Sequence, residues 1–82
     1  MSNGEPRTDP DREANALLGA AVAELRRQAG VTQAQLAERA QLQAQEIAAL
    51  EAGELEPTWG DLRRIAYALE VPLPELLARA EG

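Results

Sequence analysis

The sequence predicts an all-α protein built from five helices. Apolar residues recur three and four positions apart, as they do along one face of a helix, and no segment alternates as a half-buried strand would. Residues that favour helix starts and helix ends stand at the boundaries of these segments, and the connections between them are short. With 82 residues, the chain is long enough for one small domain.

The start of the chain differs in character from the rest. It is polar, contains Gly4 and Pro6, and offers nothing to bury. Segments of this composition do not repay the entropy cost of ordering. We therefore expect a disordered tail over residues 1–9 and place the folded domain at residues 10–82.

The first helix is predicted from Pro10 to Ala29. Asp9 can cap its start, Pro10 suits the first turn, and Gly30 marks its end. The apolar residues that recur at helical spacing within it are Leu18, Ala21, Val22 and Leu25. This stripe is expected to face the core.

Two short helices should follow. Thr32 and Gln35 form a Thr-x-x-Gln capping box at the start of the second helix. A break near Gln41 and Leu42 separates it from a third helix over about Gln43 to Ala52, which Gly53 ends. The residues expected to face inward on these two helices are Leu36, Ala37, Ala40, Ile47 and Leu50.

Capping and proline signals define the last two helices. Thr58, with Asp61 three residues on, caps the fourth, and Pro74 starts a short fifth helix. The fourth helix carries an apolar stripe of Leu62, Ile65, Ala66 and Leu69, and the fifth carries Leu76, Leu77 and Ala80. The only aromatic residues, Trp59 and Tyr67, are expected to pack near the fourth helix rather than contact a ligand.

Composition excludes several classes of function. The chain has no cysteine and no histidine, so it lacks thiolate metal ligands and the commonest general base. Its carboxylates, threonines and single tyrosine show no catalytic arrangement, and we expect neither an enzyme nor a bound cofactor or metal. No stretch approaches the ~20 apolar residues that span a bilayer, and the charged start does not resemble a signal peptide. A soluble cytoplasmic protein is expected.

The second and third predicted helices are placed as in a helix-turn-helix. Ala37 puts a small side chain where two such helices cross, and Ile47 and Leu50 follow ten and thirteen residues later on the inward face. In this region the chain resembles the Cro/repressor-type helix-turn-helix regulators, also called the xenobiotic-response-element family. The residues in the family's order and spacing are Leu25, Arg26, Gly30, Val31, Thr32, Gln33, Leu36, Ala37, Ile47, Leu50, Glu51, Gly53, Pro57, Leu62, Ile65, Ala66, Ala68, Leu69, Pro72, Glu75, Leu76 and Leu77.

The resemblance, which covers about Leu17 to Ala80, implies a compact five-helix domain of the lambda-repressor type. Such domains usually bind operator DNA as dimers, with the third helix in the major groove. The positions it assigns to double-stranded DNA are Gln33, Gln43, Ala44, Gln45, Ala48, Ala49 and Thr58. Gln33 corresponds to a phosphate contact; the alternative is a plain exposed residue. Gln45 is the best candidate for base readout, because glutamine can bond adenine bidentately.

The resemblance also implies structural pairing and assembly. Arg26 and Glu51 match an arginine–glutamate ion pair that joins the first helix to the third; the alternative is two separate surface charges. A homodimer is expected mainly through the fifth helix and the end of the fourth, with an interface that includes Leu73, Leu76, Leu77 and Ala80. Alternatively these side chains close the core of the monomer.

Charge argues against simple DNA binding. Eight arginines stand against fourteen carboxylates, for a net charge of −6, and DNA affinity depends largely on cations that neutralise phosphates. Glu54 stands where the family commonly has a lysine or arginine, and Glu56 follows it. Glu46 lies on the helix expected to face DNA. Gln41 occupies a position where the family usually has glycine in a left-handed conformation. Two functions therefore remain: a sequence-specific transcriptional regulator, or a protein-interaction module with an acidic third helix.

Overall fold

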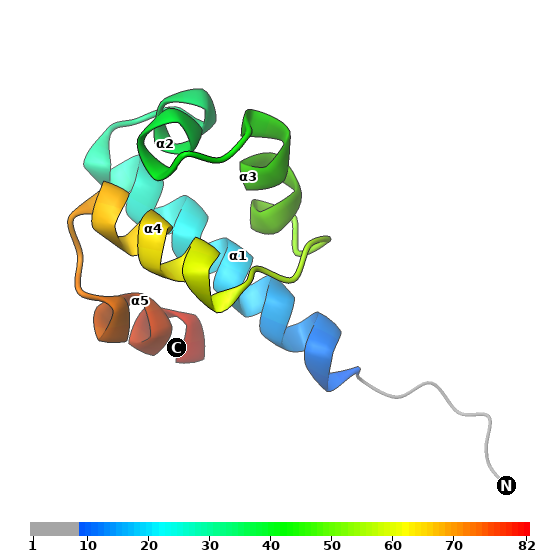
Figure 1. Cartoon of the computed structure of the whole chain (residues 1–82). Helices are drawn as coiled ribbons and strands as arrows, with labels where there is room; N and C mark the ends of the chain where they lie inside the picture. Colours follow the sequence, from blue (N-terminus) through cyan, green and yellow to red (C-terminus); the bar gives the residue numbers. More distant parts are fainter. Residues whose placement is uncertain (1–8) are drawn as a thin grey trace, which may run out of the picture.

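Five helices form the chain in the computed structural model, which describes residues 9–82 (Figure 1). Their bounds are α1 Pro10–Ala29, α2 Gln33–Ala40, α3 Ala44–Glu51, α4 Trp59–Leu69 and α5 Leu73–Glu81. Between residues 9 and 82 no segment forms a strand, and the all-α, five-helix prediction is confirmed. Of the tail predicted over residues 1–9, all but Asp9 lies outside the described residues. Asp9 itself is the N-cap of α1, where its Oδ1 accepts a hydrogen bond from the N–H of Asp11 at 3.0 Å.

Capping boxes fix the starts of α2 and α4, as the sequence predicts. The Oγ1 of Thr32 accepts from the N–H of Gln35 at 3.0 Å, and the Gln35 side chain accepts from the N–H of Thr32 at 2.8 Å. Thr58 and Asp61 repeat this exchange at 3.0 and 3.1 Å. Each box satisfies two N–H groups that a helix start otherwise leaves without partners.

Three helices end on residues in the left-handed conformation. Gly30 closes α1 with φ 75°, Gln41 closes α2 with φ 60°, and Glu70 closes α4 with φ 61°. Glycine adopts this conformation freely, whereas a residue with a Cβ is disfavoured there by roughly 1 kcal/mol. The left-handed conformation expected at Gln41 is present. Glu70 adopts it as well, although the sequence contains no glycine or asparagine there to predict it.

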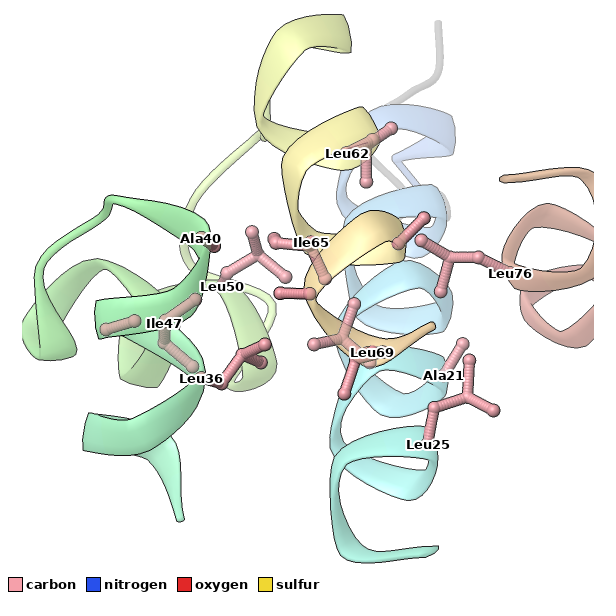
Figure 2. Close-up of a cluster of buried hydrophobic side chains, with 14 of the residues drawn as sticks. Ala21, Leu25, Leu36, Ala40, Ile47, Leu50, Leu62, Ile65, Leu69 and Leu76 are labelled. Atoms are coloured by element: carbon pink, nitrogen blue, oxygen red, sulfur yellow. The ribbon is translucent and has the colours of Figure 1, made fainter. Parts of the chain in front are cut away.

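The core lies where all five helices meet. The largest fully buried side chains are Val22, Leu36, Ile47, Leu50, Ile65 and Leu76. Figure 2 shows side chains from every helix converging on this cluster. In this view α2 and α3 lie on one side of the α1–α4 pair, and α5 lies on the other side. The predicted inward faces of α2, α3 and α4 are therefore buried together. Among the described residues, no helix is long and apolar enough to cross a membrane.

Close contact between α1 and α3 depends on Gly19. A Cβ on Gly19 would lie 2.2 Å from the carbonyl oxygen of Leu50 and 2.9 Å from that of Glu51. Gly53, with φ 77°, also lies close to α1, since a Cβ there would be 3.1 Å from the Cα of Ala16. The end of α3 is thus held against α1 at a distance that only glycine permits.

The structure bears on two expectations about apolar residues. Trp59 is 60 % exposed and Tyr67 is 85 % exposed, so neither aromatic side chain is buried in packing around α4. On α5, Leu76 is completely buried and Ala80 nearly so, because α5 packs along α1 and α4 within one chain. Leu76 therefore closes the core of the monomer, and so does most of Ala80, which also lines a surface hollow between α1 and α5.

Candidate nucleic-acid interface

The crossing of α2 and α3 is organised around Ala37. Its side chain is buried, and its carbonyl oxygen accepts a hydrogen bond from the N–H of Leu42 at 2.8 Å. Three residues, 41–43, separate the two helices. The left-handed Gln41 reverses the chain direction, so that α3 starts directly beside α2 (Figure 1). This is the arrangement of a helix-turn-helix.

One face of α3 is exposed and the opposite face is buried. Ile47 and Leu50 insert into the core. The residues on the outward face and at the N-cap, called the reading face here, are Gln43, Ala44, Gln45, Ala48 and Ala49; all are exposed except the half-buried Ala49. Within residues 9–82, the Gln45 side chain has no hydrogen-bond partner, so its amide is available to a base edge.

The carboxylate of Glu46 is turned back onto its own helix. Its Oε1 accepts a hydrogen bond from the N–H of Gln43 at 2.9 Å, and the residue is half-buried. A carboxylate at a helix N-terminus is stabilised by the helix dipole. Glu46 therefore fixes the start of α3, and its charge is less available to repel a phosphate than the sequence suggests.

Arg26 and Glu51 form a bidentate ion pair between α1 and α3. The Nε of Arg26 lies 2.6 Å from Glu51 Oε2, and one of its terminal nitrogens donates to Oε1 at 3.1 Å. The side chains are only 14 % and 7 % exposed. The remaining guanidinium nitrogen donates to the carbonyl oxygen of Val31 at 2.9 Å. The hydrogen bond to Glu51 raises the pKa of Arg26 above its ordinary value, although burial opposes the shift.

Gln33 joins this network from the start of α2. Its Nε2 donates to Oε1 of Glu51 at 2.8 Å, and the side chain is half-buried. The amide nitrogen expected to reach a phosphate is therefore bonded within the protein. The sequence carries no sign of this contact, which spans 18 residues. Arg26, Gln33 and Glu51, called the Arg26 network below, connect α1, α2 and α3 at one point.

The loop after α3 is acidic. Glu54 and Glu56 are exposed, and Thr58 is exposed at the N-cap of α4, with its hydroxyl oxygen engaged in capping. Among the arginines that could offset these charges, Arg12 lines a hollow beside Gly53 and Glu54, close to the end of α3. Arg7 lies outside the described residues, and Arg39, Arg63 and Arg64 gather elsewhere, between α2 and α4.

An apolar hollow of about 260 Å³ lies between α1 and α5. Leu17, which is 47 % exposed, forms part of it. The remaining lining residues are Ala14, Leu18, Leu77, Ala80 and Glu81. Of the four residues expected at a dimer interface, Leu77 is half-buried in this hollow and Leu73 is half-buried on the adjoining turn of α5. Over residues 9–82, no group of three or more acidic side chains is arranged to hold a metal ion.

Comparison with known proteins places the chain in a family. The sequence profile of the helix-turn-helix domain family matches residues 17–80. Two crystal structures of the clp gene regulator ClgR from Corynebacterium glutamicum are similar, each at 29 % identity. One has a TM-score of 0.82 over 96 % of this chain and 78 % of that one, and the other 0.81 over 95 % and 94 %.

The restriction-modification controller protein C.AhdI from Aeromonas hydrophila shares the fold. Its TM-score is 0.80, at 24 % identity over 83 % of this chain and 99 % of that one. A comparison with curated protein sequences finds no significant relative. The family match spans most of the chain and covers every residue of the α2–turn–α3 unit, so the predicted resemblance is confirmed: the chain belongs to the helix-turn-helix domain family.

Proposed function

We propose that the chain is a DNA-binding transcriptional regulator that reads an operator through α3. The observation that carries the proposal is the reading face, an exposed face on a helix whose other side is buried and whose two ends are fixed. Glu46 holds its start, and the Arg26 network holds its end. A recognition element held in this way loses little conformational freedom when it binds. The similarity to ClgR, which is described as a gene regulator, supports the same function.

Base readout falls chiefly to Gln45. A glutamine that bonds adenine bidentately discriminates by about 1–3 kcal/mol against other bases. Gln43 is exposed at the N-cap of the same helix and can reach a base or a phosphate. Ala44, Ala48 and Ala49 offer only methyl groups, which suit contact with thymine. The readable sequence is therefore short for one copy of the chain.

Phosphate contact at α2 is assigned chiefly to the backbone. Because one N–H of the Gln33 amide is bonded to Glu51, the side chain keeps a single N–H with which to reach a phosphate. The N–H groups of Gln33 and Ala34 belong to the first turn of α2, where a helix favours an anion. Gln33 then acts by positioning the helix start.

Low general affinity is expected from the charges. The chain carries a net charge of −6, and Glu54 and Glu56 approach the backbone of the DNA in this arrangement. Arg12 is the one described arginine placed beside that loop. Useful binding should be confined to a specific operator and to low salt, because counterion release contributes little.

A homodimer would supply the second half-site. The α1–α5 hollow provides an apolar surface, and the isologous pairing of two such surfaces matches the two-fold symmetry of operators. Leu17 and Leu77 would be its central residues, with Leu73 at its border. Leu76 and Ala80 would support it from the core.

The acidic loop favours a second candidate, a protein-interaction module without DNA affinity. Gel-shift assays on genomic fragments at ~50 mM salt separate the two. If a fragment is retarded and Gln45→Ala weakens its binding, the regulator is supported. If no fragment binds, and Glu46→Gln combined with Glu54→Lys does not restore binding, the regulator is excluded and the interaction module is favoured.

A further inference from the structure

A second surface hollow lies on the side of the molecule formed by α2 and α4. It has a volume of about 280 Å³ and is lined by Arg39, Ala40, Gln41, Arg63, Arg64 and Tyr67. We call it the arginine–tyrosine hollow. None of these residues belongs to α3, to the loop after it, or to the α1–α5 hollow. A ligand here would not cover the reading face or the proposed dimer surface.

Positive charge is concentrated in this hollow. Three of the eight basic residues of a chain with net charge −6 line it. Arg64 is paired with Asp61 at 2.7 Å, whereas within residues 9–82 neither Arg39 nor Arg63 has an ion-pair partner. The local charge is thus opposite in sign to that of the whole chain. An acidic ligand would be attracted to this hollow.

Tyr67 adds an aromatic surface to the same hollow. It is the most exposed large apolar side chain in the described part of the molecule. It lies four residues after Arg63, on the same face of α4, and the buried Ala40 contributes to the lining beside it. Tyrosine and arginine together are the residues that dominate binding in protein–protein interfaces.

We propose that the arginine–tyrosine hollow binds an acidic polypeptide segment of a partner protein. Carboxylates of the segment would pair with Arg39 and Arg63, and an apolar side chain between them would lie against the Tyr67 ring. A concave surface with an exposed aromatic side chain suits a protruding side chain better than the evenly spaced phosphates of DNA. The proposal does not depend on DNA binding. If the chain is a regulator, the partner can be held while α3 occupies an operator.

A labelled peptide tests the proposal directly. The probe is a 15-residue peptide of glutamate, aspartate, leucine and glycine, and its control replaces every carboxylate by the matching amide. Fluorescence anisotropy at low salt should show that the acidic peptide binds at least about tenfold more tightly than the amide peptide. Arg63→Gln and Tyr67→Ala should each weaken binding about threefold to tenfold. Arg27→Gln, which removes an exposed arginine elsewhere on α1, should have no effect.

Several results would overturn the proposal. They are equal binding of the two peptides, no binding up to ~1 mM, or binding that Arg63→Gln and Tyr67→Ala leave unchanged in protein with normal helicity. If these variants instead weaken binding to duplex DNA, the hollow is a phosphate contact. If Tyr67→Ala abolishes self-association in sedimentation, its occupant is a second copy of the chain. Neither DNA binding nor its failure affects the peptide result, so this test stands apart from that of the regulator.

Discussion

Gln33 donates a hydrogen bond from Nε2 to Oε1 of Glu51 over 2.8 Å, which ties the first residue of α2 to the last residue of α3. The same carboxylate receives Arg26 from α1. The angle between the two helices of the motif is therefore set at its open end by polar contacts and at the crossing by the small Ala37. This combination holds the reading face in a single orientation relative to the start of α2.

Loss of Arg26 should destabilise the domain severely. Arg26→Ala leaves the carboxylate of Glu51 buried without its cation, and stranding a charge in this way costs about 3–5 kcal/mol. A domain of this size has a net stability of about that magnitude, so the variant should be largely unfolded in urea titrations followed by circular dichroism. Arg64→Ala removes an exposed ion pair instead and should change the free energy of unfolding by less than about 1 kcal/mol. Equal midpoints for the two variants would mean that the Arg26 pair contributes no more than a surface pair.

This contribution should be insensitive to pH across the neutral range. A group whose pKa is raised on folding contributes stability below its unfolded pKa and loses it as the pH rises through the folded value. The pKa of Arg26 is raised from an already high value, so its charged state persists at every pH at which the protein would ordinarily be handled.

Substitution of Gly19 tests the close approach of α1 and α3. A methyl group in Gly19→Ala would meet the carbonyl oxygen of Leu50, and such overpacking typically costs about 1–3 kcal/mol. The gain in helix propensity, about 1 kcal/mol, offsets only part of this. Gly60→Ala is the matched control, because its Cβ would make ordinary contacts of 3.5 Å or more. Thermal melting should therefore show Gly19→Ala destabilised and Gly60→Ala unchanged or stabilised; stabilisation by both would contradict the close contact.

Much of the fold could be predicted because its signals are local. The bounds of α1 and the capping boxes at Thr32 and Thr58 each depend on residues within four positions of one another. The left-handed conformation at Gln41 is implied by the family resemblance and not by its own residue type. The buried faces of α2, α3 and α4 follow from helical periodicity. Glu70 shows the limit, since its left-handed conformation is imposed by the chain that follows and not by its own residue type.

The site could be predicted only in part, because its contacts depend on how distant helices are placed. The hydrogen bond from Gln33 to Glu51 forms only when α2 and α3 are packed together, so it cannot be predicted from either helix alone. Tyr67 is expected to pack near the fourth helix, yet it is 85 % exposed and lies four residues from Arg63 on the polar face of α4. The helical periodicity of α4 alone predicts that Tyr67 lies on the solvent-exposed face, away from the apolar stripe. The burial of Leu76 rather than Leu77 depends on the rotation of α5 against α1, which a short apolar segment leaves undetermined.

Relief of the left-handed conformation at Gln41 should stabilise the domain. Gln41→Gly removes the Cβ that disfavours φ 60°, and about 0.5–1 kcal/mol of stability should be gained even though glycine loosens the unfolded chain. Ala20→Gly, at an exposed position in the middle of α1, should lose roughly 0.5–1 kcal/mol. The midpoints of chemical unfolding of the two variants should thus shift in opposite directions from that of the wild type. A loss at both positions would mean that the Gln41 side chain makes stabilising contacts that outweigh its backbone strain.

The proposed dimer should depend on Leu17. A charge introduced by Leu17→Glu would enter the α1–α5 surface twice because of two-fold symmetry, and each buried leucine contributes about 1.5–3 kcal/mol. Sedimentation at ~100 μM should show dimers for the wild type and monomers for this variant. Trp59→Glu changes an exposed apolar side chain outside the hollow and should leave the dimer intact. A monomeric wild type at this concentration would exclude the dimer.

At the proposed DNA surface, a change of charge should alter binding to every duplex, whereas loss of a base contact should alter binding to the operator alone. Glu54→Lys exchanges a repulsive charge for one that can neutralise a phosphate, so it should tighten binding to all duplexes alike. The slope of log affinity against log salt should steepen by about one unit. Gln45→Ala should weaken binding only to the operator, by about 1–3 kcal/mol, and leave the salt slope unchanged. Glu24→Lys makes the same change in net charge on the side of α1 that faces α5, where Glu24 pairs with Arg79. If Glu24→Lys tightens binding as much as Glu54→Lys does, the gain reflects total charge and the loop after α3 does not approach the DNA.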